Sequence, residues 1–354
     1  MEAGTQPARV PERGCAGDPR SLPRARCRIP RARLSAPLPS MTEPVVRTEQ
    51  LTKRYDGLVA VRDLELTIEP GEIYGFLGPN GAGKTTTLLM VLGILKPTAG
   101  RIYLWGRPLE DDPLAVKRRV GVVGEHDYIH DHLTADEYLR FFADLYGVPH
   151  PAERIGAWLE RLGLLEFRTL RARDFSRGMK QKLALARSLL HEPDLLLLDE
   201  PVSGLDPHGV VEVRHLLLEL NRRGVTIFIS SHLLSEVEQT AHRVGIMHRG
   251  RLIRQDTIPA LRAWLRQEPV LEVELHAPVP HLEAQLRALP VVRGVQANGR
   301  RVVVTVTPGA DHRGSISQAV AAAGGVIVGM HAHEPTLEEA FLTLTDAAVD
   351  RWTS

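Results

Sequence analysis

The chain has 354 residues, of which 43% are hydrophobic and 25% are charged, and its formal net charge is +1. This length allows two domains and a tail, and the composition is typical of an ordinary soluble protein. A net charge so close to zero gives no electrostatic reason to expect nucleic acid or an anionic membrane as a partner. No apolar run approaches the roughly 20 residues of a membrane-spanning helix, so any work at a membrane requires another polypeptide.

Residues 1–43 precede the first regular hydrophobic pattern. The first 40 residues are rich in Arg, Pro and Ser and hold both cysteines, Cys15 and Cys27. A transit peptide has such a composition, but the many prolines disfavour the amphipathic helix that it needs. We therefore expect a disordered extension, with Met41 as the true start. A folded part without cysteine fits a reducing compartment and excludes a disulfide scaffold.

Residues 44–260 alternate between strand and helix patterns. The strands that we expect in this region are 45–53, 59–68, 73–77, 101–105, 120–123, 194–199, 225–230, 244–248 and 251–254. The helices that we expect are 86–92, 134–146, 152–162, 179–191, 207–223 and 235–240. The sequence from Thr134 to Glu137 fits a capping box. The helices between 125 and 192 predict a helical subdomain. Alternation elsewhere predicts an α/β fold with a parallel sheet, preceded by an antiparallel β subdomain.

Residues 269–345 have a different order of expected strands and helices. Strands are expected at 270–275, 292–295, 301–307 and 326–330, and helices at 281–289, 315–323 and 335–344. The order β-α-β-β-α-β predicts a small α+β domain of the ferredoxin-like type, followed by a tail at 346–354. It carries no Gly-rich loop or cluster of acids, so we expect an interaction or regulatory module.

The most informative segment lies between the strand at 73–77 and the helix at 86–92. It is Gly78-Pro79-Asn80-Gly81-Ala82-Gly83-Lys84-Thr85, which fits the phosphate-loop pattern G-x-x-x-x-G-K-[ST]. Glycines let the backbone form a nest of N–H groups around an anion, and the helix N-terminus adds its positive dipole end. We expect Lys84 to reach the β- and γ-phosphates and Thr85 to bind Mg²⁺.

Two acids follow another apolar strand. Asp199 and Glu200 come directly after four leucines and before Pro201. The first acid is placed to hold the Mg²⁺ shell, and the second to polarise an attacking water. A solvated turn is the alternative, and the all-leucine strand disfavours it.

The order of motifs resembles the nucleotide-binding subunits of ABC transporters over residues 44–255. The phosphate loop is similar to the Walker A motif, and residues 195–200 are similar to Walker B. The segment 175–179 resembles the signature loop, 203–206 resembles the D-loop, and His232 resembles the switch histidine. The resemblance implies that two cassettes pair head to tail, with ATP between the phosphate loop of one chain and the signature loop of the other.

The resemblance also implies roles for single residues. Those expected to contact ATP are Tyr55, Gly78, Pro79, Asn80, Gly81, Ala82, Gly83, Lys84, Thr85, Thr86, Glu125, Ser176, Gly178, Asp199 and Asp206. Tyr55 would stack on adenine, and Thr85, Asp199 and Glu125 would hold Mg²⁺. Glu200 would act as general base and His232 would contact the γ-phosphate, so the expected catalytic residues are Glu200, His232 and Lys84.

Two features depart from the common pattern of the family, the signature loop and the residue at 125. The signature is Phe-Ser-Arg-Gly-Met where Leu-Ser-Gly-Gly-Gln is common, and Arg177 adds a charge to which the sequence assigns no role. Glu125 stands where a glutamine usually bridges Mg²⁺ and the transmembrane subunit. A carboxylate is also a hard oxygen ligand, although it adds negative charge. Both departures resemble the ABC-2 type export subgroup, whose members export drugs, polysaccharides or lipids.

The resemblance implies partners as well. We expect a second ATP-binding subunit, a separate polytopic permease and no nucleic acid, with the chain on the inner face of the cell membrane. One alternative is a soluble ABC ATPase that acts on ribosomes or nucleic acid, but such proteins usually carry two cassettes and basic linkers. An importer subunit is a second alternative, and the ferredoxin-like pattern mildly disfavours it.

Other residues are weaker candidates for a functional site. The histidines at 126, 130, 132, 331 and 333 allow a metal site, but no acids or cysteines complete a set, which favours solvated loops. Tyr138, Phe141, Phe142 and Tyr146 fit either a groove for a permease helix or the core of the helical subdomain. Trp158 and Trp264 are assigned to packing.

Overall fold

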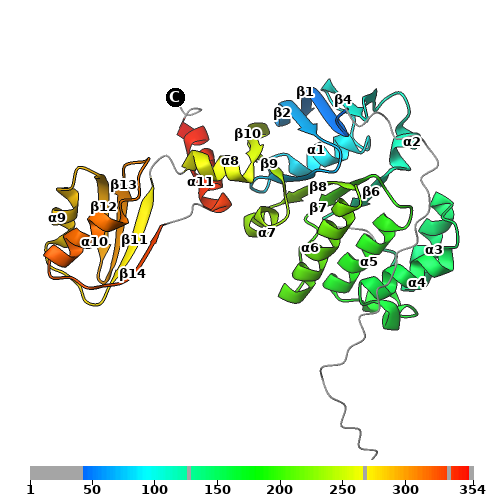
Figure 1. Ribbon diagram of the computed structural model, residues 1–354. Helices are drawn as coiled ribbons and strands as arrows, with labels where there is room; N and C mark the ends of the chain where they lie inside the picture. Colours follow the sequence, from blue (N-terminus) through cyan, green and yellow to red (C-terminus); the bar gives the residue numbers. More distant parts are fainter. Residues whose placement is uncertain (1–42, 126–128, 266–268, 333–335, 351–354) are drawn as a thin grey trace, which may run out of the picture. The chain divides into compact units, whose positions relative to one another are not determined.

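The computed structural model describes residues 43–125, 129–265, 269–332 and 336–350 (Figure 1). The expected N-terminal extension and the expected start at Met41 lie outside the described residues. The described part contains an α/β core with a helical subdomain and a smaller α+β module.

An antiparallel sheet opens the described chain. Its strands are β1 (Val46–Tyr55), β2 (Leu58–Ile68), β4 (Ala99–Leu104) and β5 (Arg107–Pro108), in the order β2-β1-β4-β5. The inward side chains of β1 and β2, among them Leu51, Leu64 and Leu66, are fully buried. The expected antiparallel subdomain is therefore present.

The central sheet has the order β10-β9-β3-β8-β7-β6. Its strands are β3 (Ile73–Leu77), β6 (Val120–Val123), β7 (Leu195–Asp199), β8 (Thr226–Ser231), β9 (Arg243–His248) and β10 (Arg251–Thr257). All neighbours are parallel except β9 and β10. Parallel strands end at one edge of a sheet, so the segments after β3, β7, β8 and β9 meet there.

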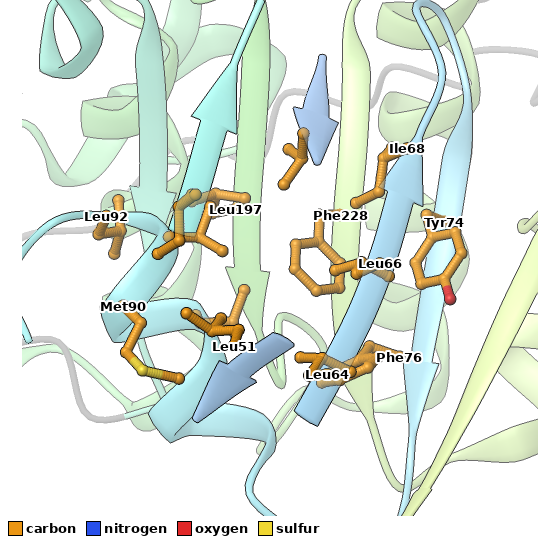
Figure 2. Close-up of a cluster of buried hydrophobic side chains, with 14 of the residues drawn as sticks. Leu51, Leu64, Leu66, Ile68, Tyr74, Phe76, Met90, Leu92, Leu197 and Phe228 are labelled. Carbon is orange, nitrogen blue, oxygen red and sulfur yellow. The ribbon is translucent and has the colours of Figure 1, made fainter. Parts of the chain in front are cut away.

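One apolar core joins the two sheets. Phe228 of β8 packs edge to face on Tyr74 and Phe76 of β3, with ring centroids 5.7 and 5.3 Å apart. Figure 2 shows these rings among Leu51, Leu64 and Leu66 of the antiparallel sheet and Met90 of helix α1 (Lys84–Val91). Burial of this cluster fixes β3 and α1, and with them the loop between the two.

The helical subdomain consists of α3 (Ala135–Tyr146), α4 (Pro151–Arg161) and α5 (Arg177–Leu189), with short 3-10 turns at Leu165–Phe167 and Ala172–Asp174. The expected capping box forms, because Thr134 accepts from the N–H of Glu137 and Glu137 accepts from the N–H of Thr134. Helix α5 begins two residues before the expected start, since Ser176 acts as its N-cap.

The aromatic residues of α3 divide between the two expected uses. Tyr138 is fully buried, and Phe142 packs edge to face against it. Phe141 is 54% exposed, and Tyr146 stacks on His191. One face of α3 therefore belongs to the core, and the side that carries Phe141 faces outward. Trp158 is buried, and Trp264 is part of a cluster with α7 (Leu234–Glu238) and α8 (Ile258–Leu265).

The remaining helices of the core are α2 (Pro113–Lys117) and α6 (Pro207–Arg222). Asp206 caps α6 and Pro207 is its first residue, as the sequence predicts. Helix α8 and the short elements β5 and α2 were not among the expected elements.

The smaller module contains β11 (Val270–Leu275), α9 (Leu282–Arg287), β12 (Val292–Asn298), β13 (Arg301–Val306), α10 (Arg313–Ala322) and β14 (Ile327–Ala332). The sheet is antiparallel with the order β12-β13-β11-β14. This order, with α9 and α10 on one face of the sheet, confirms the ferredoxin-like topology (Figure 1). The module has its own core, centred on Val273, Val302 and Val304.

The last helix, α11 (Leu337–Asp350), corrects the expected one. It was expected at 335–344, inside the accessory domain of 269–345 and before a tail at 346–354. It extends to residue 350, and Leu337 and Leu344 are buried with Val237 of α7 and Leu261 of α8. The sequence pattern marks an apolar face on α11 but cannot say which element covers it.

Candidate functional site

The phosphate loop is shaped by three glycines between β3 and α1. Gly81 and Gly83 have φ angles of 79° and 105°, a region that side chains disfavour. A Cβ on Gly83 would lie 2.4 Å from the carbonyl oxygen of Ala60, and one on Gly78 would lie 2.6 Å from that of Met247. The loop therefore needs glycine for conformation and for close packing against neighbouring backbone.

Lys84 is buried at the start of α1. Its Nζ donates to the carbonyl oxygens of Gly78, at 2.7 Å, and Pro79, at 3.3 Å, so the side chain closes over its own loop. Burial lowers the pKa of Lys84, while the charges of Glu200, Asp199 and Glu125 act in the opposite direction. The lysine is thus close to three acids that lie far from it in the sequence, namely Glu125 and the adjacent pair Asp199 and Glu200.

A chain of hydroxyl groups links the phosphate loop to the carboxyl ends of β7 and β8. Thr85 Oγ1 donates to Asp199 Oδ2 at 2.8 Å, and Ser230 Oγ donates to the other oxygen, Asp199 Oδ1. Asp199 and Ser230 are both buried. The carboxylate is therefore held from both sides, in one orientation, beside the first turn of α1.

Glu200 has a strained backbone next to Asp199. Its φ is 52°, which is uncommon for a residue with a long side chain. The Glu200 N–H donates to the carbonyl oxygen of Ser230 at 3.0 Å, which holds this turn. Glu200 Oε2 lies 2.8 Å from His232 Nδ1 and 3.5 Å from Ser231 Oγ. Glu200 is buried and His232 is about half exposed, so the pair reaches from the interior to the surface.

Glu125 and Tyr55 are more exposed. Glu125 follows β6, and its charge acts on Lys84. Tyr55 is 46% exposed at the end of β1. The start of β2, in the same hairpin, approaches the phosphate loop at Ala60 and Val61. The hairpin that carries Tyr55 therefore lies against the phosphate loop through Ala60 and Val61.

The signature and D-loop segments pack on one another. A Cβ on Gly178 would lie 3.3 Å from Leu205, and Asp206 accepts from the N–H of Gly209 as the cap of α6. Ser176 accepts from the N–H of Met179 as the cap of α5. Among the residues that the structure describes, no hydrogen bond joins Ser176, Gly178 or Asp206 to the phosphate loop. The expected nucleotide contacts therefore fall into two groups within this chain.

Sequence reasoning missed several residues of these groups. Ser230 and Ser231 orient the two acids, and the signal available was their place at the end of the strand before His232. Gln181 is buried, and its amide donates to the carbonyl oxygen of Pro201 at 3.0 Å. A glutamine on the apolar face of a predicted helix is the signal that could have found it.

The histidines do not form a metal site in the described part of the chain. His130, His132 and His331 are accessible to solvent, and His126 and His333 lie outside the described residues. No group of three or more His, Cys, Asp or Glu side chains in the described ranges is placed to hold a metal ion.

A buried lysine in a glycine loop, beside two acids at the end of a strand in a parallel sheet, defines a phosphate-loop nucleotide-binding protein. The comparisons with known proteins agree. The profile of the family described as "ABC transporter" matches residues 61–203. The bacitracin transport ATP-binding protein BcrA of Bacillus licheniformis is 44% identical over 232 residues, which cover 65% of this chain and 75% of that protein.

Two further likenesses extend this result. The Nod factor export ATP-binding protein I of Burkholderia thailandensis is 36% identical over 307 residues, which cover 84% of this chain and 95% of that protein. The solved structure of an ATP-binding subunit of an ABC transporter matches with a TM-score of 0.59 and 29% identity, over 63% of this chain and 93% of that one.

The chain belongs to the ATP-binding proteins of the ABC transporter family. The predictions of an ABC ATPase and of its cassette fold are confirmed, and a transport role is favoured over action on ribosomes or nucleic acid. No helix in the described ranges has the length and apolar character needed to cross a membrane.

Proposed function

We propose that this chain is the ATP-hydrolysing subunit of an exporter and works as a head-to-tail pair beneath a separate permease. The observation that carries the proposal is the hydrogen-bonded group around Asp199 and Glu200, which links the phosphate loop to β7 and β8. Such a group suits phosphoryl transfer to water, which depends on positioning and on electrostatic stabilisation.

The phosphate loop supplies the anion site. The backbone N–H groups of Asn80, Gly81, Gly83 and Lys84 and the N-terminus of α1 offer a positive surface for the phosphates of ATP. The ammonium group of Lys84, held within the loop, adds the charge that the β- and γ-phosphates need. Tyr55 is proposed to stack on the adenine ring.

The residues present fit Mg²⁺. The ion prefers hard oxygen ligands, and Thr85 Oγ1 and Asp199 Oδ2 lie only 2.8 Å apart, with Glu125 near the same lysine. We propose that these three residues hold the ion directly or through water. When bound, Mg²⁺ would neutralise phosphate charge and orient the γ-phosphate.

Glu200 is proposed as the general base. Its carboxylate is buried at the end of β7, and a positioned base at such a place can accept a proton from an attacking water. His232, 2.8 Å away, is proposed to fix the orientation of the carboxylate and to reach the γ-phosphate with its exposed ring. Strain at Glu200 is consistent with a turn that is kept for chemistry.

The second group of residues is proposed to act on the nucleotide of a second chain. As the N-cap of α5, Ser176 uses a lone pair of its hydroxyl to accept from Met179, which leaves the hydroxyl proton free to donate. The N-terminus of α5 is a further anion site. Ser176, Gly178 and Asp206 would thus complete the site of the partner, and ATP would close the pair.

The permease would contact the helical subdomain. Phe141 and Leu145 are exposed on α3, as expected for a surface that receives an apolar helix.

We place the chain on the inner face of the cell membrane. We propose that the module of residues 269–332 is regulatory. We propose that the permease sets the transported cargo. The name of the Burkholderia relative, a Nod factor export protein, supports export, and that of the Bacillus relative supports transport.

A pull-down tests this function. The Glu200→Gln variant would be expressed in the source cell, trapped with ATP and extracted from membranes in mild detergent. We expect a polytopic membrane protein of about six apolar helices to co-purify. Lys84→Ala, which cannot hold ATP, is the matched control. Ribosomal proteins or nucleic acid without a membrane protein would contradict the proposal.

A further inference from the structure

Arg177 occupies an unusual position for a cation. It is the first residue of α5, directly after the cap Ser176. The N-terminus of a helix carries partial positive charge, so a cation there is unfavourable for the helix itself. The side chain must therefore be explained by what it contacts.

Arg177 crosses to the D-loop segment. Its Nη2 donates to Ser203 Oγ at 2.8 Å, and its aliphatic stem lies over Gly204. A Cβ on Gly204, which has a φ of 79°, would lie 2.6 Å from Arg177 Cδ. The D-loop thus has a glycine at the one place where Arg177 covers its backbone.

A second hydrogen bond joins α5 to the turn that precedes the D-loop. Gln181, one turn further along α5, donates to the carbonyl oxygen of Pro201. The N–H of Ser203 in turn donates to the carbonyl oxygen of Glu200 at 3.0 Å. The path from Arg177 to the turn that carries Glu200 therefore consists of two consecutive hydrogen bonds.

We propose that Arg177 is a positioning residue that joins the signature loop to the D-loop, so that both face a second chain as one unit. When Ser176 contacts the nucleotide of a partner chain, Arg177 thereby couples this contact to the position of the turn that holds Glu200 in its own chain. The inference rests on the proposed head-to-tail pairing. It gives the departure from the common signature a function that the sequence alone does not reveal.

A double-mutant cycle tests the link. Arg177→Met keeps the stem and removes the donor, and Ser203→Ala removes the acceptor. We expect each to lower kcat for ATP about five- to tenfold while KM changes less than about twofold, because the effect is on orientation and not on binding. The double variant should be no slower than either single one, since both remove the same bond.

Two further variants separate positioning from general damage. Arg177→Lys keeps a donor and should restore part of kcat. Arg173→Met removes a nearby exposed arginine whose side chain pairs with its neighbour Asp174, at 3.7 Å, and should leave kcat unchanged. Melting temperatures should agree among all variants, since Arg177 is exposed.

Multiplicative effects in the double variant, a change in KM instead of kcat, or full activity of Arg177→Met would overturn the inference. Failure of the proposed function can be distinguished from failure of the role proposed for Arg177. In that case Glu200→Gln keeps its activity, whereas an inactive Glu200→Gln beside a fully active Arg177→Met contradicts the role of Arg177 alone.

Discussion

The two groups of nucleotide-site residues differ in how far the chain itself completes them. Around the phosphate loop, Lys84, Asp199 and Glu200 are buried and hydrogen-bonded to fixed neighbours. At the signature and D-loop, Ser176, Arg177 and Asp206 are exposed. The fold therefore buries the charged residues at the centre of the first group and leaves these residues of the second group on the surface. A site divided in this way suits a reaction that a second chain must complete.

The largest expected effect is in the buried group. Glu200→Gln keeps the size of the side chain and a hydrogen-bonding contact with His232, but it removes the proton acceptor. We expect ATP binding within about twofold of the unchanged protein and turnover lowered by roughly 10²–10⁴-fold. Equilibrium binding of a fluorescent ATP analogue and single-turnover hydrolysis measure the two quantities. Unchanged turnover would remove Glu200 from the role of base.

A pair of glycine substitutions compares how tightly the two groups are packed. Gly83→Ala combines a φ of 105° with a Cβ 2.4 Å from a backbone oxygen, whereas Gly178→Ala brings a Cβ to 3.3 Å from a leucine side chain. We expect the first to lower the free energy of unfolding by about 2–4 kcal/mol and the second by less than about 1 kcal/mol. Urea unfolding of both variants measures this, and equal losses would contradict the contrast.

The sequence predicts the buried group better than the surface group, for physical reasons. Phosphate binding requires glycines and a lysine at fixed spacing, and a buried strand is a continuous apolar run, so the loop and β3 are predicted from neighbouring residues. The hydrogen bond between Ser230 and Asp199 forms because β7 pairs with β8. The sequence pattern of either strand alone does not predict this pairing. The contact of Arg177 with Ser203 joins residues that are 26 positions apart.

The same limit explains the error at the end of the chain. The sequence predicts a helix after the last strand but does not show which element that helix packs against. The N–H of Leu337 donates to Glu238 Oε1 at 3.2 Å, beside Arg262, which ties the start of α11 to α7 and α8. Packing partners of this kind follow from tertiary structure and not from periodicity.

The smallest expected effect concerns His191, which connects α5 to the central sheet. Its Nε2 lies 3.2 Å from the carbonyl oxygen of Val120 in β6, and its ring stacks on Tyr146. Burial lowers the pKa of His191 below 6.5, and the charge of Arg187 acts in the same direction. The unfolded chain therefore takes up the proton first, and stability is lost as the pH falls from 6.5 toward the folded pKa.

We expect the melting temperature to fall by a few degrees more between pH 7.5 and pH 5 in the unchanged protein than in His191→Gln. The two proteins differ only at residue 191, so the difference between them isolates the contribution of His191. Equal pH dependence in the two proteins would mean that His191 does not couple the helix to the sheet through its charge.

Mixing two inactive variants tests the divided site most directly. Lys84→Ala disables the phosphate loop, and Gly178→Asp places a carboxylate in the signature loop, where it suits the start of a helix but repels phosphate. In a mixed head-to-tail pair, one site combines the intact loop of one chain with the intact signature of the other. Random pairing and independent sites predict that the mixture recovers about a quarter of the unchanged ATPase activity. Activity no greater than that of the two variants measured separately would contradict a site shared between chains.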